Sequence, residues 1–241
     1  LAFAKAIQHS ALPTVHPLYD NRKEFDIFAS MHTAKEVGGD FYDFYFIDED
    51  HLAFLIADVS GKGIPAAMFM MRSKTIIKSY AESGMSVEEV FTLANEKLCE
   101  GNDAGMFVTA WMGILNIRTG KILFANAGHN HPLVKHSDGT FEYLKSRAGF
   151  VLAGMEGVRY RKNELVLEPG DAIYLYTDGV TEATDLNEEL YGEDRLHSFL
   201  EKYKDETMEV ICSEIKKDVD LFAGEAPQFD DITMLALKYY G

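Results

Sequence analysis

The sequence predicts an α+β fold, in which strands and helices form separate layers. Apolar runs typical of strands come first, two helical segments follow, strands return, and two further helices precede a last strand. This grouping differs from the regular strand-helix alternation that builds a parallel sheet. With 241 residues, of which 47% are hydrophobic, the chain can bury a large core and has a size that one domain can reach.

Periodicity and residue type place the strands. The run from His51 to Val59 is almost continuously apolar, as expected of a strand that is buried on both faces. Residues 107–117 and 122–127 flank a short turn that contains Gly120, so they predict a hairpin. The other strands are expected at residues 25–31, 41–47, 132–135, 165–167, 172–176 and 232–239.

Apolar residues at helical spacing place the helices. Residues 64–80 show this spacing, and Met68, Met70 and Met71 within them are interpreted as core filling. The sequence Ser-Val-Glu-Glu that begins at Ser86 is a capping box, which predicts the start of a second helix. Further helices are expected at about residues 193–203 and 206–222.

Residues 1–13 are expected to form a linker helix that stops before Pro13, and residues 14–241 to form the functional domain. The helix has a loose apolar stripe, which leaves two interpretations open. It packs on its own domain, or it connects that domain to an upstream regulatory domain or to a dimer partner. The chain begins with Leu1 rather than Met, as a fragment of a longer protein would.

Composition disfavours several classes of function. The chain has 39 acidic and 23 basic residues, a net charge of −16, and such a surface repels nucleic acid and anionic lipid. The longest apolar run, residues 64–71, is far shorter than the roughly 20 residues that a membrane span requires. Cys99 and Cys212 provide neither a disulfide framework nor a zinc pattern, which is typical of a reducing cytoplasm.

Aspartates recur at the ends of the predicted strands, each with glycine close by. The segments are Gly38-Gly39-Asp40, Asp58-Val59-Ser60-Gly61, Thr177-Asp178-Gly179 and Phe229-Asp230-Asp231. An aspartate at a strand end can project its carboxylate into a cleft, and glycine lets the backbone turn sharply. Clustered carboxylates repel one another unless Mg²⁺ or Mn²⁺ compensates, and two such ions about 3.5–4 Å apart can activate water for attack on phosphorus. Each segment alone is a common turn, but the four together predict a metal centre.

In this order, the motifs closely resemble the SpoIIE/RsbU-type branch of the metal-dependent protein phosphatases, the PPM or type-2C-like superfamily. The matching segments are Glu36-Val-Gly-Gly-Asp-Phe-Tyr-Asp43, Ala57-Asp-Val-Ser-Gly-Lys-Gly63, Asn126-Ala-Gly-His129, Thr177-Asp-Gly-Val-Thr-Glu182 and Asp230-Asp-Ile-Thr233. The resemblance extends from about residue 7 to residue 239. It implies an αββα four-layer sandwich with two central antiparallel sheets flanked by helices. It also implies that a metal-activated water hydrolyses phosphoserine or phosphothreonine, with two Mn²⁺ or Mg²⁺ ions and no phosphoenzyme.

The resemblance also implies a ligand set. Asp58 would bridge both ions, Asp40 and the carbonyl of Val59 would complete one site, and Asp178 with Asp230 would complete the other. Asp58 and Asp178 are accordingly the residues expected to be central to catalysis. No organic cofactor is implied.

Other residues near these motifs are expected to support the site. Asp231, Gly39 and Gly179 are candidates for positions directly behind the ligands, with direct ligation by Asp231 as the alternative. Asp43 is expected to be structural because it falls inside the next strand. Ser60 stands where the eukaryotic branch has a histidine, a candidate acid for the leaving alcohol, so that proton must come from water or another group.

Three tempting features are given the less specific interpretation. His129 and His131 are interpreted as part of a turn after a strand rather than as a metal-binding pair, and Trp111 as a core residue. Lys35 is the basic residue nearest the first acidic ligand, but it is not expected to clamp phosphate.

By resemblance, the substrate would be a phosphorylated anti-sigma-factor antagonist in a cytoplasmic bacterial partner-switching pathway. The segment before Pro13 would connect to an upstream sensor domain and is a candidate for homodimer formation, and an absent upstream region could tether the protein to a membrane. The alternative is a non-catalytic pseudophosphatase that binds its partner, and it is disfavoured because no acidic ligand is missing. A two-metal nuclease is disfavoured by the net charge of −16 and by the lack of a basic groove.

Overall fold

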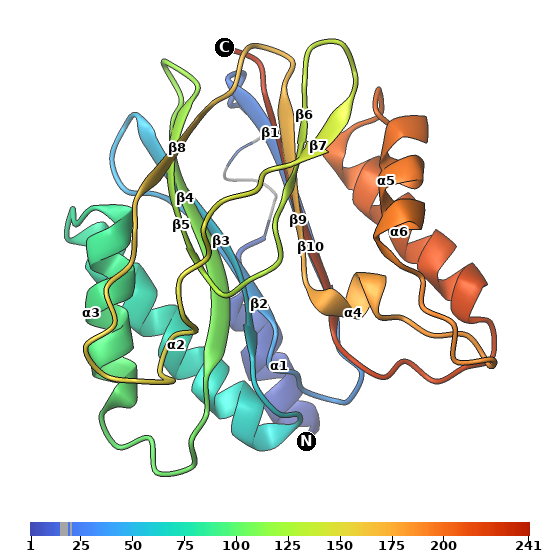
Figure 1. The fold of residues 1–241 in the computed structure, drawn as a ribbon. Helices are drawn as coiled ribbons and strands as arrows, with labels where there is room; N and C mark the ends of the chain where they lie inside the picture. Colours follow the sequence, from blue (N-terminus) through green and yellow to red (C-terminus); the bar gives the residue numbers. More distant parts are fainter. Residues whose placement is uncertain (15–18, 20) are drawn as a thin grey trace. The chain divides into compact units, whose positions relative to one another are not determined.

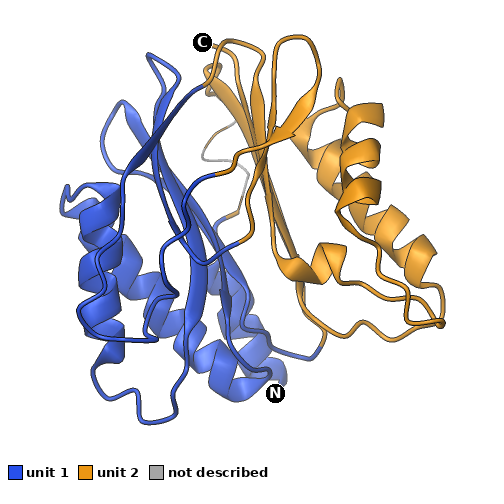
Figure 2. Cartoon of the chain, in the orientation of Figure 1, with its two compact units in different colours: residues 1–13, 35–129, 146–166 blue, residues 14–34, 130–145, 167–241 orange. Residues whose placement is uncertain are grey.

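The computed structural model describes residues 1–14, 19 and 21–241, and it divides into two compact units (Figures 1 and 2). Unit 1 contains residues 1–13, 35–129 and 146–166, and unit 2 contains residues 14–34, 130–145 and 167–241. Each unit is assembled from three separate stretches of chain. No single linker in the sequence therefore marks a boundary between them.

Unit 1 is built on a five-stranded antiparallel sheet in the order β2-β3-β4-β5-β8. Its strands are β2 (Phe41–Phe46), β3 (His51–Val59), β4 (Val108–Asn116), β5 (Lys121–Ala127) and β8 (Asn163–Val166). The helices α2 (Ile64–Glu82) and α3 (Val87–Cys99) pack against it. Trp111 is completely buried and lies against Phe54 and Phe124, so the prediction that it belongs to the core is confirmed.

The helix α1 (Ala2–Ala11) also belongs to unit 1 and contacts α2. The buried Gln8 side chain fixes it, because its amide nitrogen donates to the carbonyl of Gly38 at 2.7 Å and its oxygen accepts from the Gly38 amide at 3.1 Å. This contact supports the interpretation that the helix packs on its own domain. Its connection to an upstream domain stays a prediction.

Unit 2 is built on a second five-stranded antiparallel sheet in the order β1-β10-β9-β6-β7. Its strands are β1 (Phe25–His32), β6 (Leu133–Lys135), β7 (Phe141–Tyr143), β9 (Ala172–Tyr176) and β10 (Ile232–Tyr239), and its helices are α4 (Asp178–Thr181), α5 (Glu193–Lys202) and α6 (Met208–Ala223). In Figure 1, α5 and α6 lie along one side of this sheet. The core of the unit packs Tyr174 and Met234 of the sheet with Cys212 and Ile215 of α6.

Most predicted elements are confirmed within a few residues, and β3 runs from His51 to Val59 as expected. The capping box also forms, since Glu89 accepts a hydrogen bond from the Ser86 amide at 3.0 Å. The strand β7 and the helix α4 were not predicted, because three and four residues are too few to establish a periodicity.

One prediction about the core is wrong. Met70 is buried, but Met68 is 70% exposed. The buried stripe of α2 follows Ala66, Met70, Ser73 and Ile77, and a residue two positions before Met70 is rotated about 200° from it around the helix. Among the described residues, no helix is both long and apolar enough to cross a membrane.

Candidate metal centre

Asp40 and Asp58 come together at the end of one ladder in unit 1. The β2–β3 pairing joins Phe41 to Ala57, so the next position along the ladder places Asp40 opposite Asp58. The Val59 amide donates to the carbonyl of Gly39 at 3.3 Å, which continues the contact beyond the two strands. Asp40 is 1% exposed and Asp58 is half-buried, so this register places a buried carboxylate residue opposite a half-buried one. Such a pair requires a compensating positive charge.

Gly39 is required by the close approach of the two chains. A Cβ atom at this position would lie 2.8 Å from the carbonyl oxygen of Val59 and 3.2 Å from the Cβ of Ala66. Any side chain would therefore push Val59, whose carbonyl oxygen is a candidate ligand, away from Asp40. The position of Gly39 directly behind the ligands stays a prediction.

Ser60 is tied to Phe107 by two hydrogen bonds. Its amide donates to the carbonyl of Phe107 at 2.8 Å, and its Oγ accepts from the Phe107 amide at 3.0 Å. These bonds fix the peptide that follows Val59. The Ser60 hydroxyl therefore holds the backbone in place, which is a different task from that of the histidine found there in the eukaryotic branch.

In unit 2, α4 begins with Asp178 immediately after β9. Thr177 fixes this junction, because its amide donates to the carbonyl of Thr233 at 3.0 Å and its Oγ1 accepts from the Thr233 amide at 3.1 Å. A Cβ atom on Gly179 would overlap the carbonyl oxygen of Asp231. Only glycine thus allows the start of α4 to lie against the turn that carries Asp230 and Asp231.

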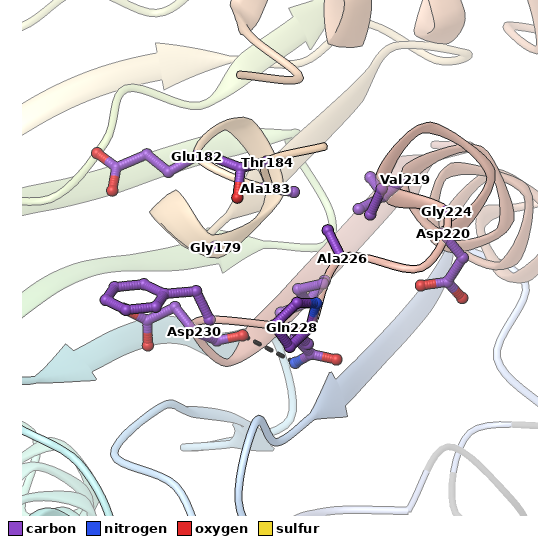
Figure 3. A pocket seen from close by; sticks show the side chains of 14 residues that line it. Gly179, Glu182, Ala183, Thr184, Val219, Asp220, Gly224, Ala226, Gln228 and Asp230 are labelled. Atoms are coloured by element: carbon purple, nitrogen blue, oxygen red, sulfur yellow. Dashed lines mark hydrogen bonds between the residues drawn. The ribbon is translucent and has the colours of Figure 1, made fainter. Parts of the chain in front are cut away.

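Asp230 and Asp231 have different surroundings. Asp231 is 7% exposed, and its Oδ1 accepts a hydrogen bond from the Ala34 amide at 2.9 Å. Asp230 is half-buried and, with Gly179, lines a cavity of about 170 Å³ (Figure 3). The amide of Asp231 donates to Asp230 Oδ1 at 2.9 Å. This arrangement favours Asp230 as the ligand and Asp231 as the residue that anchors the turn.

The donor set suits a hard divalent cation. All five candidate ligand groups are oxygens, four from carboxylates and one from the Val59 carbonyl, and Mg²⁺ and Mn²⁺ prefer such ligands. Among the residues that the structure describes, no three His, Cys, Asp or Glu side chains form a group that could hold an ion. Each unit by itself contains two of the candidate carboxylates, Asp40 and Asp58 in unit 1 and Asp178 and Asp230 in unit 2.

Asp43 has a different partner, as a structural role requires. Its carboxylate is buried and pairs with Lys74 Nζ of α2 at 2.9 Å. Burial raises the pKa of Asp43, and the nearby Lys74 ammonium offsets part of that rise. The charge of Asp43 is thus matched inside unit 1 without a metal ion.

The surroundings of His129 were not predicted from the sequence. The turn after β5 forms as expected, with Gly128 at a φ of 70°. However, His129 is 5% exposed, and its Nδ1 lies 3.0 Å from Oγ1 of Thr109, the residue paired with Asp58 across the β3–β4 ladder. The available signal was the position of Asn126, three residues before His129, where it can close a turn onto the backbone.

A family model described as Stage II sporulation protein E (SpoIIE) matches residues 48–240. The chain is 30% identical over 264 residues to protein IcfG of Synechocystis sp. and 31% identical over 242 residues to the phosphoserine phosphatase RsbU of Bacillus subtilis. These alignments cover 97% and 99% of this chain, but only 40% of IcfG and 69% of RsbU.

Solved structures share the fold. The SiaA-PP2C domain of Pseudomonas aeruginosa is 24% identical, with a TM-score of 0.86 over 99% of this chain and 95% of that one. RsbX, solved in complex with magnesium, is 18% identical, with a TM-score of 0.69 over 91% of this chain and 97% of its own.

The fold and the family match define a PP2C-type α+β phosphatase domain, which confirms the predicted fold class. The chain belongs to the SpoIIE family of serine/threonine phosphatases, and the phosphatases of this family are metal-dependent.

Proposed function

We propose that this domain removes phosphate from phosphoserine or phosphothreonine on a bacterial regulatory protein. Two Mn²⁺ or Mg²⁺ ions would be held by Asp40, Asp58, the Val59 carbonyl, Asp178 and Asp230. The observation that carries the proposal is the register that sets Asp40 opposite Asp58 at a strand end, with Gly39 letting the two chains approach closely. The magnesium in RsbX supports the choice of ion.

When bound, such ions would supply Lewis acidity toward the phosphoryl oxygens and would lower the pKa of a bound water. The residues of the chain have the task of holding the ligands in place. Asp58 is expected to be shared by both sites, Ser60 fixes the peptide after Val59, and Asp231 anchors the turn that carries Asp230. Without a cation, these carboxylates would repel a phosphate group, so hydrolysis is expected to stop when the metal is removed.

The proposed substrate is a phosphorylated anti-sigma-factor antagonist of a partner-switching pathway. RsbU, a phosphoserine phosphatase, supports phosphoserine as the group that reacts, and the antagonist is proposed from the resemblance of the motifs. The exposed Lys35 is the basic residue nearest Asp40 in the sequence, and it is not expected to clamp the phosphate strongly. Binding energy would then come from surfaces of a folded partner that lie away from the phosphate. We further propose that the domain works in the cytoplasm, with α1 connecting it to an upstream sensor and to a second copy of the chain.

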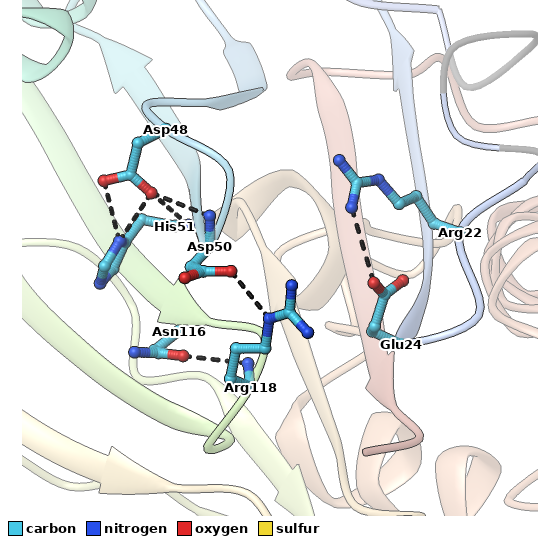
Figure 4. A network of polar contacts seen from close by, with 7 residues as sticks. All are labelled: Arg22, Glu24, Asp48, Asp50, His51, Asn116 and Arg118. Carbon is cyan, nitrogen blue, oxygen red and sulfur yellow. Dashed lines mark hydrogen bonds and ion pairs between the residues drawn. The ribbon is translucent and has the colours of Figure 1, made fainter.

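Hydrolysis by the purified chain tests the proposal. Release of phosphate from a phosphoserine protein and from p-nitrophenyl phosphate should depend on Mn²⁺, and Asp58→Ala should abolish it. Asp50→Ala is the matched control. Asp50 lies just before the first residue of β3, at the end of the strand opposite to Asp58, and its carboxylate accepts a hydrogen bond from Arg118 Nε at 2.8 Å (Figure 4). Activity no higher than that of Asp58→Ala at saturating Mn²⁺ would contradict the proposal and favour a non-catalytic binding module.

A further inference from the structure

The Asn126-Ala-Gly-His129 segment forms a closed turn that holds one histidine in place. The side chain of Asn126 bonds both backbone groups of His129: its Oδ1 accepts from the amide at 2.7 Å, and its Nδ2 donates to the carbonyl at 3.0 Å. Gly128 takes the left-handed φ of 70° that the turn requires. Asn126 is 3% exposed and His129 is 5% exposed, so both residues that form the clamp are buried.

The clamp directs His129 toward the strand that neighbours Asp58. His129 Nδ1 lies 3.0 Å from Oγ1 of Thr109, and the β3–β4 ladder pairs Thr109 with Asp58. Directly opposite residues of an antiparallel pair have Cβ atoms about 4.5–5.5 Å apart and side chains on the same face. The Thr109 hydroxyl therefore has His129 on one side and shares a sheet face with the Asp58 carboxylate.

We propose that His129 and Thr109 are positioning residues for Asp58, an inference that rests on the proposed metal site. A hydroxyl has one proton and two lone pairs. When His129 donates its Nδ1 proton to Thr109 Oγ1, the hydroxyl proton of Thr109 is left for the Asp58 carboxylate on the same sheet face. A hydrogen bond between the two would hold the Asp58 carboxylate in place to bind a metal ion. Partners of this kind commonly set the affinity of a metal site.

A purely structural role for the same residues makes a different prediction. If His129 only filled the core, its loss would lower the free energy of unfolding and leave the metal affinity of the folded protein unchanged. If it acts through Thr109, removing either residue weakens Mn²⁺ binding, and removing both has little further effect. The dissociation constant for Mn²⁺ alone, measured by calorimetry on the purified chain, separates the two.

The substitutions can be paired with conservative partners. Thr109→Val removes the hydroxyl, whereas Thr109→Ser keeps it. His129→Gln moves the donor away from the Nδ1 position, whereas the amide of His129→Asn lies near it. Thr109→Val and His129→Gln should each weaken Mn²⁺ binding by about tenfold or more. Thr109→Ser and His129→Asn should bind Mn²⁺ about as tightly as the wild type. The Thr109→Val/His129→Gln double variant should have a dissociation constant close to that of either single variant.

Two substitutions elsewhere in unit 1 serve as controls. Thr75→Val removes a hydroxyl that bonds only within α2, to the carbonyl of Met71 at 2.8 Å. His51→Gln changes the histidine at the opposite end of β3, where it pairs with Asp48. Neither should change Mn²⁺ affinity, and thermal unfolding should show that all variants are folded.

A spectroscopic measurement tests the direction of the hydrogen bond. Nitrogen-15 spectra of the metal-free protein should show His129 with its proton on Nδ1. A proton on Nε2 alone would overturn the proposal, as would a folded Thr109→Val variant that binds Mn²⁺ as tightly as the wild type. A wild type that binds Mn²⁺ but hydrolyses no phosphoester would contradict the proposed function. The positioning role of His129 and Thr109 would still be supported if Thr109→Val bound Mn²⁺ more weakly than that wild type.

Discussion

The amide of Ala153 donates a hydrogen bond to Oδ1 of Asn95 at 2.8 Å, although Ala153 holds a left-handed φ of 64°. Asn95 is completely buried in α3, and its Nδ2 also donates to the carbonyl of Met155 at 2.9 Å. The carbonyl of Ala153 accepts from Asn102 Nδ2 at 3.2 Å. Two asparagine side chains thus hold a backbone conformation that a residue with a Cβ rarely adopts.

Asn95→Ala should destabilise the protein by about 2–3 kcal/mol, because it leaves the Ala153 amide and the Met155 carbonyl without this partner. Ala153→Gly should change stability by less than about 1 kcal/mol, since the relief of left-handed strain is offset by the greater freedom of glycine in the unfolded chain. Urea denaturation measures both. If Ala153→Gly lowered the free energy of unfolding by more than about 2 kcal/mol, this would contradict the view that the asparagines serve to hold the left-handed φ of Ala153.

The hydrogen bonds between Ser60 and Phe107 predict that an introduced histidine does not supply the acid of the eukaryotic branch. Ser60→His removes the acceptor of the Phe107 amide and should lower both stability and kcat. Ser60→Thr keeps the hydroxyl and should keep most of the activity. Steady-state kinetics on p-nitrophenyl phosphate, combined with thermal unfolding, compare the two variants. A Ser60→His enzyme with a higher kcat than the wild type would show that the position is open to a catalytic acid.

Neighbouring aspartates should respond differently to the same substitution. Asp230→Asn should weaken Mn²⁺ binding and lower kcat/KM by at least about 100-fold, with little change in stability, because it removes a proposed ligand charge. Asp231→Asn keeps an oxygen that can accept from the Ala34 amide, so it should keep the fold and much of the activity. Asp231→Ala loses that acceptor and should destabilise by about 1–3 kcal/mol. Calorimetry measures the Mn²⁺ affinity and thermal unfolding measures the stability. Equal Mn²⁺ affinity in Asp230→Asn and Asp231→Asn would contradict the assignment of Asp230 as the ligand.

The sequence was most informative where the signal was local. The strand His51–Val59 could be predicted because its residues are almost all apolar, and Asp40 and Asp58 became candidates because each stands at a strand end beside glycine. The pairing that sets them opposite one another depends on register between two strands, which the sequence does not encode locally.

Contacts between distant residues could not be predicted in the same way. The hydrogen bond between Thr109 and His129 joins positions 20 residues apart, and the one between Asn95 and Ala153 joins positions 58 apart. Neither Thr109 nor Ala153 belongs to a motif. The difference between Asp230 and Asp231 likewise follows from Ala34, a residue 197 positions from Asp231.

The buried pair of Asp43 and Lys74 predicts a stability effect that depends on pH. Both side chains are almost inaccessible, with 3% and 11% exposure. Lys74→Met should destabilise the protein by about 3 kcal/mol at pH 7, because it leaves an ionised carboxylate buried without its partner. Loss of the ammonium also raises the pKa of Asp43 beyond the rise that burial already causes.

The sign of the pH dependence follows from that pKa. The folded variant binds the Asp43 proton more tightly than the unfolded chain does, so its stability falls as pH rises from about 4, the usual pKa of an aspartate, through the raised value. The destabilisation caused by Lys74→Met should therefore shrink as pH is lowered from 7 toward 4. Adding Asp43→Asn to Lys74→Met should remove this pH dependence, because no buried carboxylate is left to titrate at that position. Urea denaturation of both variants and the wild type at pH 4.5 and 7 measures the effect, and a constant difference between Lys74→Met and wild type would contradict it.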